Sequence, residues 1–121
     1  MPQRVNWLDM HAVVETPNFS RNVDKVLGNE NYHELIDFLA RNPLAGDEMP
    51  GTGGVRKMRI AASGRGRRGG ARVVYFYGGI AIPVYLLMIY PKSAREDISS
   101  GERHVLTNLA AVLSKKGKEG K

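Results

Sequence analysis

The segment AIPVYLLMIY, residues 81–90, limits most strongly how this chain can fold. It contains no charged residue, and apolar side chains occupy both of the alternating sets that a strand directs to its two faces. The segment is too short to cross a membrane as a helix. It is typical of a central strand that is covered on both sides, with Pro83 tolerated near its start. The sequence therefore predicts a layered fold built around this strand.

Two further strands are predicted before it. The segment VRKMRIAA, residues 55–62, alternates in character, so that its two faces carry different side chains: Val55, Lys57 and Arg59 on one, Met58 and Ile60 on the other. The segment ARVVYFY, residues 71–77, is rich in β-branched and aromatic residues. The pair Gly78-Gly79 predicts a tight hairpin between this strand and the apolar one.

Helical patterns lie on both sides of these strands. We predict a short strand at residues 11–15, followed by helices at 16–28 and 29–43. In the second helix one apolar stripe is formed by Tyr32, Leu35, Ile36 and Leu39. We expect an Asn cap at its start and an end before Pro43. Residues 44–54 form a loop rich in Gly and Pro. Ser99 and Glu102 form a capping box that begins a last helix, with an apolar stripe of Val105, Leu106, Leu109, Val112 and Leu113. The order β-α-α-β-β-β-α predicts an α+β domain, with helices on one face of a small, mainly antiparallel sheet.

The length of 121 residues predicts one domain, which we place at residues 11–114. Residues 1–10 are interpreted as an N-terminal extension and residues 115–121 as a basic, solvated tail. There is no cysteine, which excludes a disulfide framework and a thiolate metal site. We find no pattern of a secretory signal, so a cytoplasmic location is expected.

Charge is strongly segregated along the chain. The net charge is +6, but no acidic residue occurs between Glu48 and Glu96. Nine basic residues fall in that block: Arg56, Lys57, Arg59, Arg65, Arg67, Arg68, Arg72, Lys92 and Arg95. The rest of the chain holds nine basic and twelve acidic residues, a net charge of −3. Such segregation favours a polyanionic partner, with nucleic acid as the leading candidate.

The segment GRGRRG, residues 64–69, matches the GxGxxG pattern of dinucleotide-binding proteins. That pattern requires a helix after the glycines, whereas a strand follows here, and an acidic residue about 20 positions later is absent. A disordered RGG tract would be longer and would not lie between two strands. A basic hairpin tip beside Lys57, Arg59 and Arg72 is the favoured interpretation, with a merely solvated loop as the alternative.

Several pieces of the sequence together resemble a known family. The most specific segments are GTGGVRKMR, GGARVVY and YLLMIYPK, and the similarity runs from about His11 to Leu113. The chain resembles the RelE/ParE superfamily of bacterial type II toxins, and most closely the HigB-like branch of RelE toxins. The resemblance implies two N-terminal helices and a C-terminal helix on a small twisted sheet. It also implies a ribosome-dependent mRNA endonuclease that inhibits translation. A co-encoded antitoxin, which we expect to be a helix-turn-helix protein similar to HigA, would hold it inactive.

Cleavage of RNA through its 2′-hydroxyl requires loss of the hydroxyl proton, stabilisation of the phosphate and protonation of the leaving oxygen. The three histidines, His11, His33 and His104, are scattered, and the block from 49 to 95 has no carboxylate for a metal. We therefore expect a cationic site without a metal or other cofactor. A lysine crowded by arginines favours its neutral form, which suits Lys57 as base or proton shuttle. Arg59 and Arg72 suit phosphate clamping, and Lys92 is a supporting cation.

The resemblance supports part of this set, since Lys57 and Arg59 match the paired basic residues of the RelE active strand and Arg72 its phosphate-contacting arginine. RNA binding is assigned to Arg56, Arg65, Arg67, Arg68 and Tyr90. For Arg56 and Arg95, a role as solvated surface charges is an alternative at least as well supported as RNA binding. Tyr90 suits either stacking on a splayed base or a place in the core.

The sequence also departs from the RelE pattern. Ser93 and Ser99 stand where RelE has an arginine and a tyrosine, which leaves the acid for the leaving group unassigned. Two other functions stay open at this point: a ParE-like inhibitor of gyrase, and a non-catalytic module that binds RNA or the ribosome.

Overall fold

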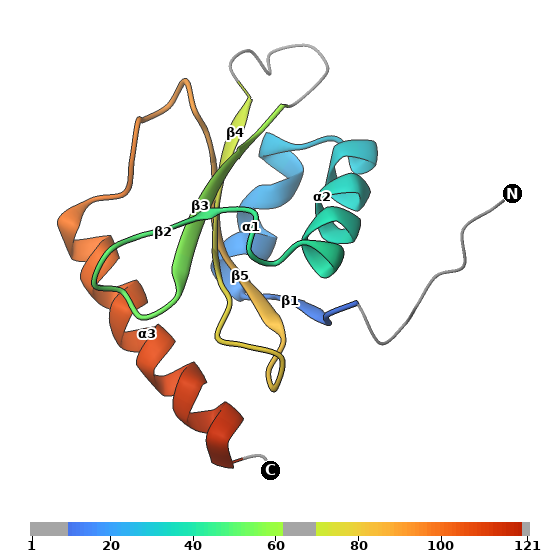
Figure 1. Cartoon of the computed structure of the whole chain (residues 1–121). Helices are drawn as coiled ribbons and strands as arrows, with labels where there is room; N and C mark the ends of the chain where they lie inside the picture. The colour runs from blue at the N-terminus through green and yellow to red at the C-terminus, as the bar shows by residue number, and fades with distance from the viewer. Residues whose placement is uncertain (1–9, 62–69, 120–121) are drawn as a thin grey trace, which may run out of the picture.

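The computed structural model describes residues 10–61 and 70–119 (Figure 1). Within these residues the chain forms three helices and one five-stranded sheet. In chain order the elements are β1 (Val13–Glu15), α1 (Pro17–Val26), α2 (Asn29–Arg41), β2 (Asp47–Glu48), β3 (Val55–Ile60), β4 (Ala71–Phe76), β5 (Val84–Pro91) and α3 (Ser100–Glu119). The predicted α+β class and element order are confirmed, with the short strand β2 added inside the predicted loop. Of the predicted N-terminal extension, all but Met10 lies outside the described residues.

The strands lie in the order β1-β5-β4-β3-β2, so the apolar strand β5 is flanked on both sides. It pairs parallel with β1, while the other pairs are antiparallel. The predicted tight turn at Gly78-Gly79 is wrong, because the connection from β4 to β5 runs from 77 to 83. The two glycines serve other needs. A Cβ on Gly78 would lie 2.6 Å from the Phe76 ring, and Gly79 has a φ of +119°.

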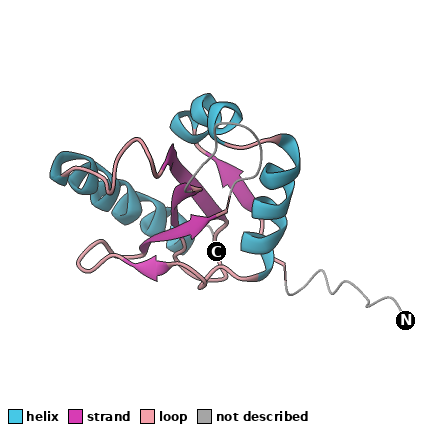
Figure 2. Cartoon of the chain, turned by 90° about the horizontal axis from the view of Figure 1, so that it is seen from above, coloured by secondary structure: helices cyan, strands magenta, loops and turns pink. Residues whose placement is uncertain are grey.

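The helices cover both faces of the sheet, not one as the sequence suggested (Figures 1 and 2). On what is here termed the α1/α2 face, Phe19, Val23, Leu35 and Leu39 pack with Val73, Tyr75 and Leu86. On the opposite, α3 face, Leu106, Ala110 and Leu113 pack with Val74, Phe76 and Met88. Strands β4 and β5 are apolar on both sides, so each face needs its own helical cover. A helix on one face alone would leave half of these side chains in water.

A bulge in β5 decides which of its residues face α3. Val74 pairs with Met88, but the next residue, Tyr75, pairs with Leu86, so Leu87 is an extra residue in β5. Leu87 and Met88 therefore both lie on the α3 face, and the alternation beyond them is inverted. Tyr90 consequently lies on the α3 face. Without the bulge it would share the α1/α2 face with Leu86.

The sequence predicted some of the helix ends correctly and others incorrectly. The capping box of α3 is confirmed: the Ser99 N–H donates to Glu102 Oε1 at 2.8 Å, and the Glu102 N–H donates to Ser99 Oγ at 3.1 Å. The expected Asn cap of α2 is wrong, since Gly28 is the capping residue and Asn29 is already helical. The helix α3 continues through residues 115–119, into the segment assigned to a tail. Lysine is a good helix former and is favoured near a helix C-terminus.

The apolar stripe of α3 is narrower than predicted. Leu106 and Leu113 are buried as expected, together with Ala110. Val105 and Val112 are 62% and 53% exposed, because they lie one position to the side of the face that meets the sheet.

A buried tyrosine ties the segment after α2 to the centre of the sheet. The Tyr75 hydroxyl donates to the carbonyl of Pro43 and accepts from the N–H of Gly46, both at 2.8 Å. A Cβ on Gly46 would lie 2.9 Å from the Tyr75 ring and from the Lys57 carbonyl oxygen. Burial raises the pKa of Tyr75, so the hydroxyl keeps its proton and continues to donate.

We expect Tyr75→Phe to lower the free energy of unfolding by about 1–3 kcal/mol, because the N–H of Gly46 and the carbonyl of Pro43 lose a buried partner. Urea unfolding followed by circular dichroism measures this. Tyr85→Phe, at a half-exposed position of β5, is the matched control and should change stability by less than about 0.5 kcal/mol. Equal effects of the two substitutions would contradict a special role for the Tyr75 hydroxyl.

Candidate nucleic-acid interface

Three basic side chains gather on the α3 face of the sheet. Arg59 of β3 pairs directly with Arg72 of β4, and Lys57 pairs with Val74 two positions away. Residues opposite each other in neighbouring strands have Cβ atoms about 5 Å apart. Lys57, Arg59 and Arg72 are here termed the cationic cluster. The alternation of β3 predicted that Lys57 and Arg59 share a face, and the register adds Arg72 to them.

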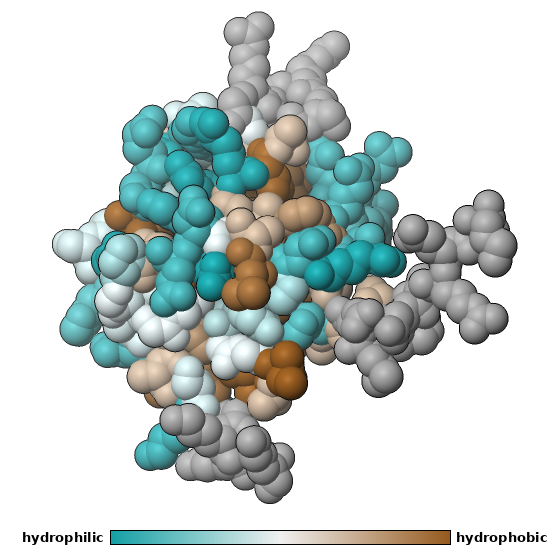
Figure 3. All heavy atoms as spheres, viewed as in Figure 1, coloured by the Kyte–Doolittle hydropathy of each residue, from teal (hydrophilic) through white to brown (hydrophobic). Residues whose placement is uncertain are grey.

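The chain segment from 91 to 99 connects the end of β5 to the start of α3, on the side of the sheet where α3 lies (Figure 1). It contacts the cluster through Asp97 and covers Tyr90 through Arg95. Tyr90 pairs with Arg72 across β5 and β4, so the inverted alternation of β5 brings it beside the cluster. In the view of Figure 3, hydrophilic side chains gather at the upper left of the molecule, with apolar groups beside them and toward the centre.

Asp97 is a functional candidate that the sequence interpretation missed. Its Oδ2 lies 3.0 Å from Lys57 Nζ, and its Oδ1 accepts the N–H of Ile98 at 2.8 Å. Partial burial acts to raise the pKa of Asp97. The hydrogen bonds from Lys57 and Ile98 and the charges of Lys57 and Arg72 outweigh it and hold the pKa below its usual value. The sequence suggested that arginines crowd Lys57, and the structure adds a carboxylate beside it.

The position of Asp97 in the sequence gave a weak hint. It directly follows Glu96, the first acidic residue after the acid-free block, and it stands two residues before the capping box. Forty positions separate it from Lys57, so only the path of the chain after β5 brings the two together.

A second charged network fixes the segment from 91 to 99 to α3. The Arg95 guanidinium lies over the Tyr90 ring, with Cζ 4.6 Å from the ring centroid. Its two terminal nitrogens donate to the two oxygens of Glu102 at 2.8 and 3.0 Å. The hydrogen bond with Glu102 raises the pKa of Arg95, and the same bond lowers the pKa of Glu102. Arg95 is thus a packed and paired side chain, not the freely solvated charge considered from the sequence.

Tyr90 is not available for stacking in this arrangement. It is 6% exposed, and Arg95 covers its ring. Burial raises its pKa, and within the described residues neither the Tyr90 hydroxyl nor Arg72 Nε has a hydrogen-bond partner. Buried polar atoms in folded proteins usually have a hydrogen-bond partner. The two atoms belong to residues paired across β4 and β5, which places both at the edge of the cationic cluster.

The remaining predicted site residues divide into three groups. Arg56 lies on the other face of β3 and is 16% exposed. It donates to the carbonyls of Gly46 and Leu44 at 2.6 and 3.3 Å and lies 3.6 Å from Glu48. Lys92 follows β5 beside the start of β4, where its N–H donates to the Gly70 carbonyl at 3.1 Å. Arg65, Arg67 and Arg68 lie outside the described residues, so their role stays a prediction.

The three histidines lie in separate places. His11 precedes β1 with its ring edge toward Tyr77, His33 is on α2, and His104 is on α3. In residues 10–61 and 70–119 no group of three or more His, Cys, Asp or Glu side chains is placed to hold a metal ion. No helix in these ranges is long and apolar enough to cross a membrane.

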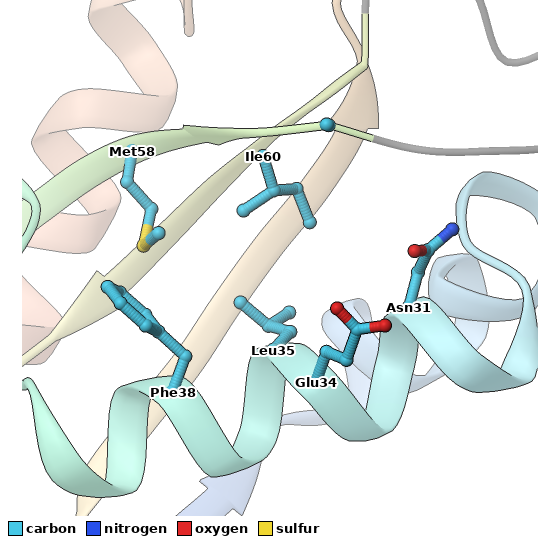
Figure 4. A pocket seen from close by; sticks show the side chains of 7 residues that line it. Asn31, Glu34, Leu35, Phe38, Met58 and Ile60 are labelled. Carbon is cyan, nitrogen blue, oxygen red and sulfur yellow. The ribbon is translucent and has the colours of Figure 1, made fainter.

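An apolar hollow lies behind the cationic cluster, on the other side of β3. Met58 and Ile60 point toward Leu35 and Phe38 of α2 and enclose about 290 Å³, with Glu34 near one end (Figure 4). Phe38 is 41% exposed there. The alternation of one strand thus separates a charged surface from an apolar one.

Comparison with protein families settles the relationship of this chain. The RelE toxin of the RelE/RelB toxin–antitoxin system matches residues 19–120. The chain belongs to the RelE toxin family. This RelE-family chain is also similar in structure to the E. coli toxin RelE, solved in the free state as a mutant with two arginines changed to alanine. The TM-score is 0.55 at 14% sequence identity, over 83% of this chain and 96% of that one, which shows a shared fold. The HigB-like branch stays a prediction.

We expect the ion pair between Arg95 and Glu102 to stabilise this RelE-family fold in a pH-dependent way. Because the pKa of Glu102 is lowered in the folded state, the stabilisation is present above the ordinary value of 4.5 and is lost as the pH falls through the folded value. Glu102→Gln keeps one oxygen for the Ser99 N–H, removes the charge and replaces the oxygen that accepts from the second terminal nitrogen of Arg95 with an NH2 group. Urea unfolding at low salt should show a loss of about 0.5–1 kcal/mol at pH 7. At pH 2.5 the variant and the wild type should be equally stable. A difference that persists at low pH would contradict the assignment.

Proposed function

We propose that this chain is the toxin of a type II toxin–antitoxin pair and that it stops translation by cutting mRNA on the ribosome. Family membership supports the first part, and the cationic cluster supports the second. The observation that carries the proposal is that Lys57, Arg59 and Arg72 lie together on one face of the sheet. Beside them, the buried Arg72 Nε and Tyr90 hydroxyl lack a hydrogen-bond partner within the described residues. Such a surface suits a phosphodiester and a developing negative charge.

The chemistry proposed is transfer of the phosphodiester to the neighbouring 2′-oxygen, with no metal ion. The 2′-oxygen bonds to phosphorus and the bond to the 5′-oxygen breaks, which yields a 2′,3′-cyclic phosphate and a 5′-hydroxyl. One proton leaves the 2′-hydroxyl and one is taken up by the 5′-oxygen, so the overall proton count is unchanged. The forked donors of Arg59 and Arg72 would bind the phosphate oxygens as charge grows in the transition state.

We assign Lys57 to the same clamp and not to removal of the 2′-hydroxyl proton. The reason is the carboxylate of Asp97, to which the ammonium group of Lys57 donates a hydrogen bond at 3.0 Å. An ammonium group that donates to a carboxylate contributes through its positive field and its remaining N–H donors. This changes the role that the sequence suggested, base or proton shuttle, while it keeps the residue in the site.

The proposed partners are the ribosome, mRNA and a cognate antitoxin, in the cytoplasm. A net charge of +6 with a concentrated basic block favours association with ribosomal RNA. An antitoxin similar to HigA would be the neutralising partner. Two surfaces suit such a partner, the cationic cluster and the apolar hollow between α2 and β3.

Mapping of cuts in a translated message by primer extension, with and without ribosomes, tests the proposal. We expect cuts only when ribosomes are present. Arg72→Ala should reduce the cleavage rate by about 10²–10³-fold, because one donor to the transition-state charge is lost. Arg41→Ala is the control, since Arg41 pairs with Asp37 on the surface of α2, and it should cut like the wild type.

Two results would contradict the proposal in different ways. Growth arrest with intact mRNA and broken DNA would indicate an inhibitor of gyrase. A loss of only a few fold in Arg72→Ala, with a weaker dependence of RNA binding on salt, would indicate a binding module without catalysis.

A further inference from the structure

The ion pair between Lys57 and Asp97 joins two separate parts of the fold. Lys57 comes from the middle of β3, and Asp97 comes from the segment that Arg95, Glu102 and the capping box fix to α3. The two side chains are 29% and 50% exposed. A pair this open to solvent adds little to the stability of a fold. Its position on the cationic cluster therefore calls for a functional reason.

We propose that Asp97 is a positioning residue of the cleavage site, which holds the ammonium group of Lys57 beside Arg59 and Arg72. This inference rests on the proposed function and deepens it. Asp97 would not touch the reacting atoms; it would act through Lys57. A free lysine side chain samples many rotamers, whereas the bond to Asp97 selects one before the substrate arrives.

The charged groups around Asp97 are consistent with this role. Lys57 faces it from β3, and Arg72 contributes positive charge from β4. The ring of Tyr90 on β5 lies under Arg95, whose guanidinium is already paired with Glu102 at the start of α3. Glu102 is thus occupied by Arg95, whereas Asp97 Oδ2 lies 3.0 Å from Lys57 Nζ in the cationic cluster.

The bond to Asp97 also leaves Lys57 able to contact RNA. An ammonium group has three N–H donors, and Asp97 takes one of them through Oδ2. Within the described residues the other two have no partner, which leaves them for phosphate oxygens. Asp97 Oδ1 is bound to the Ile98 N–H, which fixes the plane of the carboxylate. The carboxylate therefore directs the lysine without having to leave when substrate binds.

A double-mutant cycle of Asp97→Asn and Lys57→Arg tests the proposal by single-turnover cleavage on ribosomes. Asparagine keeps an oxygen for the Ile98 N–H and removes the charge. We expect Asp97→Asn to lower the maximal rate by about 10–100-fold, because a misplaced catalytic group costs that much. Lys57→Arg, a cation at every accessible pH, should stay within about tenfold of the wild type. In the Lys57→Arg background the Asp97→Asn change should cost much less. Asp37→Asn, on the paired surface of α2, is the matched control and should have no effect.

Three outcomes would overturn the proposal. A wild-type rate in Asp97→Asn would show that the pair has no role in cleavage. A faster rate would show that Asp97 competes with the RNA phosphate for Lys57. A Lys57→Arg variant as inactive as Lys57→Met would show that Lys57 must give up its proton and acts as the base.

A second measurement does not depend on cleavage. Carbon-13 NMR titration of the Asp97 carboxyl should show a pKa that rises toward its usual value in Lys57→Met, because a cation that lowers it is lost. An unchanged pKa would show that the pair does not form in solution and would overturn the inference. If the pKa rises but wild-type protein leaves translated mRNA intact, the proposed function fails while the pair itself is established.

Discussion

The extra residue in β5 is the constraint on which the rest of the structure depends. With Leu87 and Met88 both on the α3 face, β5 contributes to two cores and then reverses its alternation. Tyr90 is thereby directed to the face where Arg72 lies, and the chain leaves the sheet on the side of α3. The segment from 91 to 99 can then cross the cationic cluster on its way to the capping box. A regular strand would have sent Tyr90 into the core beneath α1 and α2.

The candidate site is therefore a group of charged side chains between the sheet and the segment from 91 to 99, which ion pairs and the capping box hold against α3. Its cations come from β3 and β4, and its carboxylates come from the segment after β5 and from the first turn of α3. Opposite charges are arranged in two separate pairs, Lys57 with Asp97 and Arg95 with Glu102. Arg59 and Arg72 have no ion pair among the described residues, which leaves them to bind an external anion. Members of the RelE family act as toxins, and a surface of this kind is suited to RNA.

Much of the fold could be predicted from the sequence because its patterns are local. The alternation of β3, the capping box of α3 and the apolar character of β5 each appear within a few consecutive residues. The wrong predictions arose where a local sequence pattern was used to infer how residues lie in three dimensions. Two glycines suggested a tight turn, although one makes room for the Phe76 ring and the other has a positive φ. Arg56 appeared to be one more cation of the basic block, yet its place in the alternation sends it to the opposite face.

The sequence by itself determined most of the helices and strands, the segregation of charge and the presence of Lys57 and Arg59 on one face, because strand geometry fixes which neighbours share a side. Only the tertiary structure decided that Arg72 and Tyr90 join them, since strand register and the bulge are set by packing across the sheet. It also decided that Asp97 meets Lys57. Forty residues separate the two, and no local interaction encodes a contact over that distance. It depends on where β5 ends and where α3 begins, which the two cores fix together.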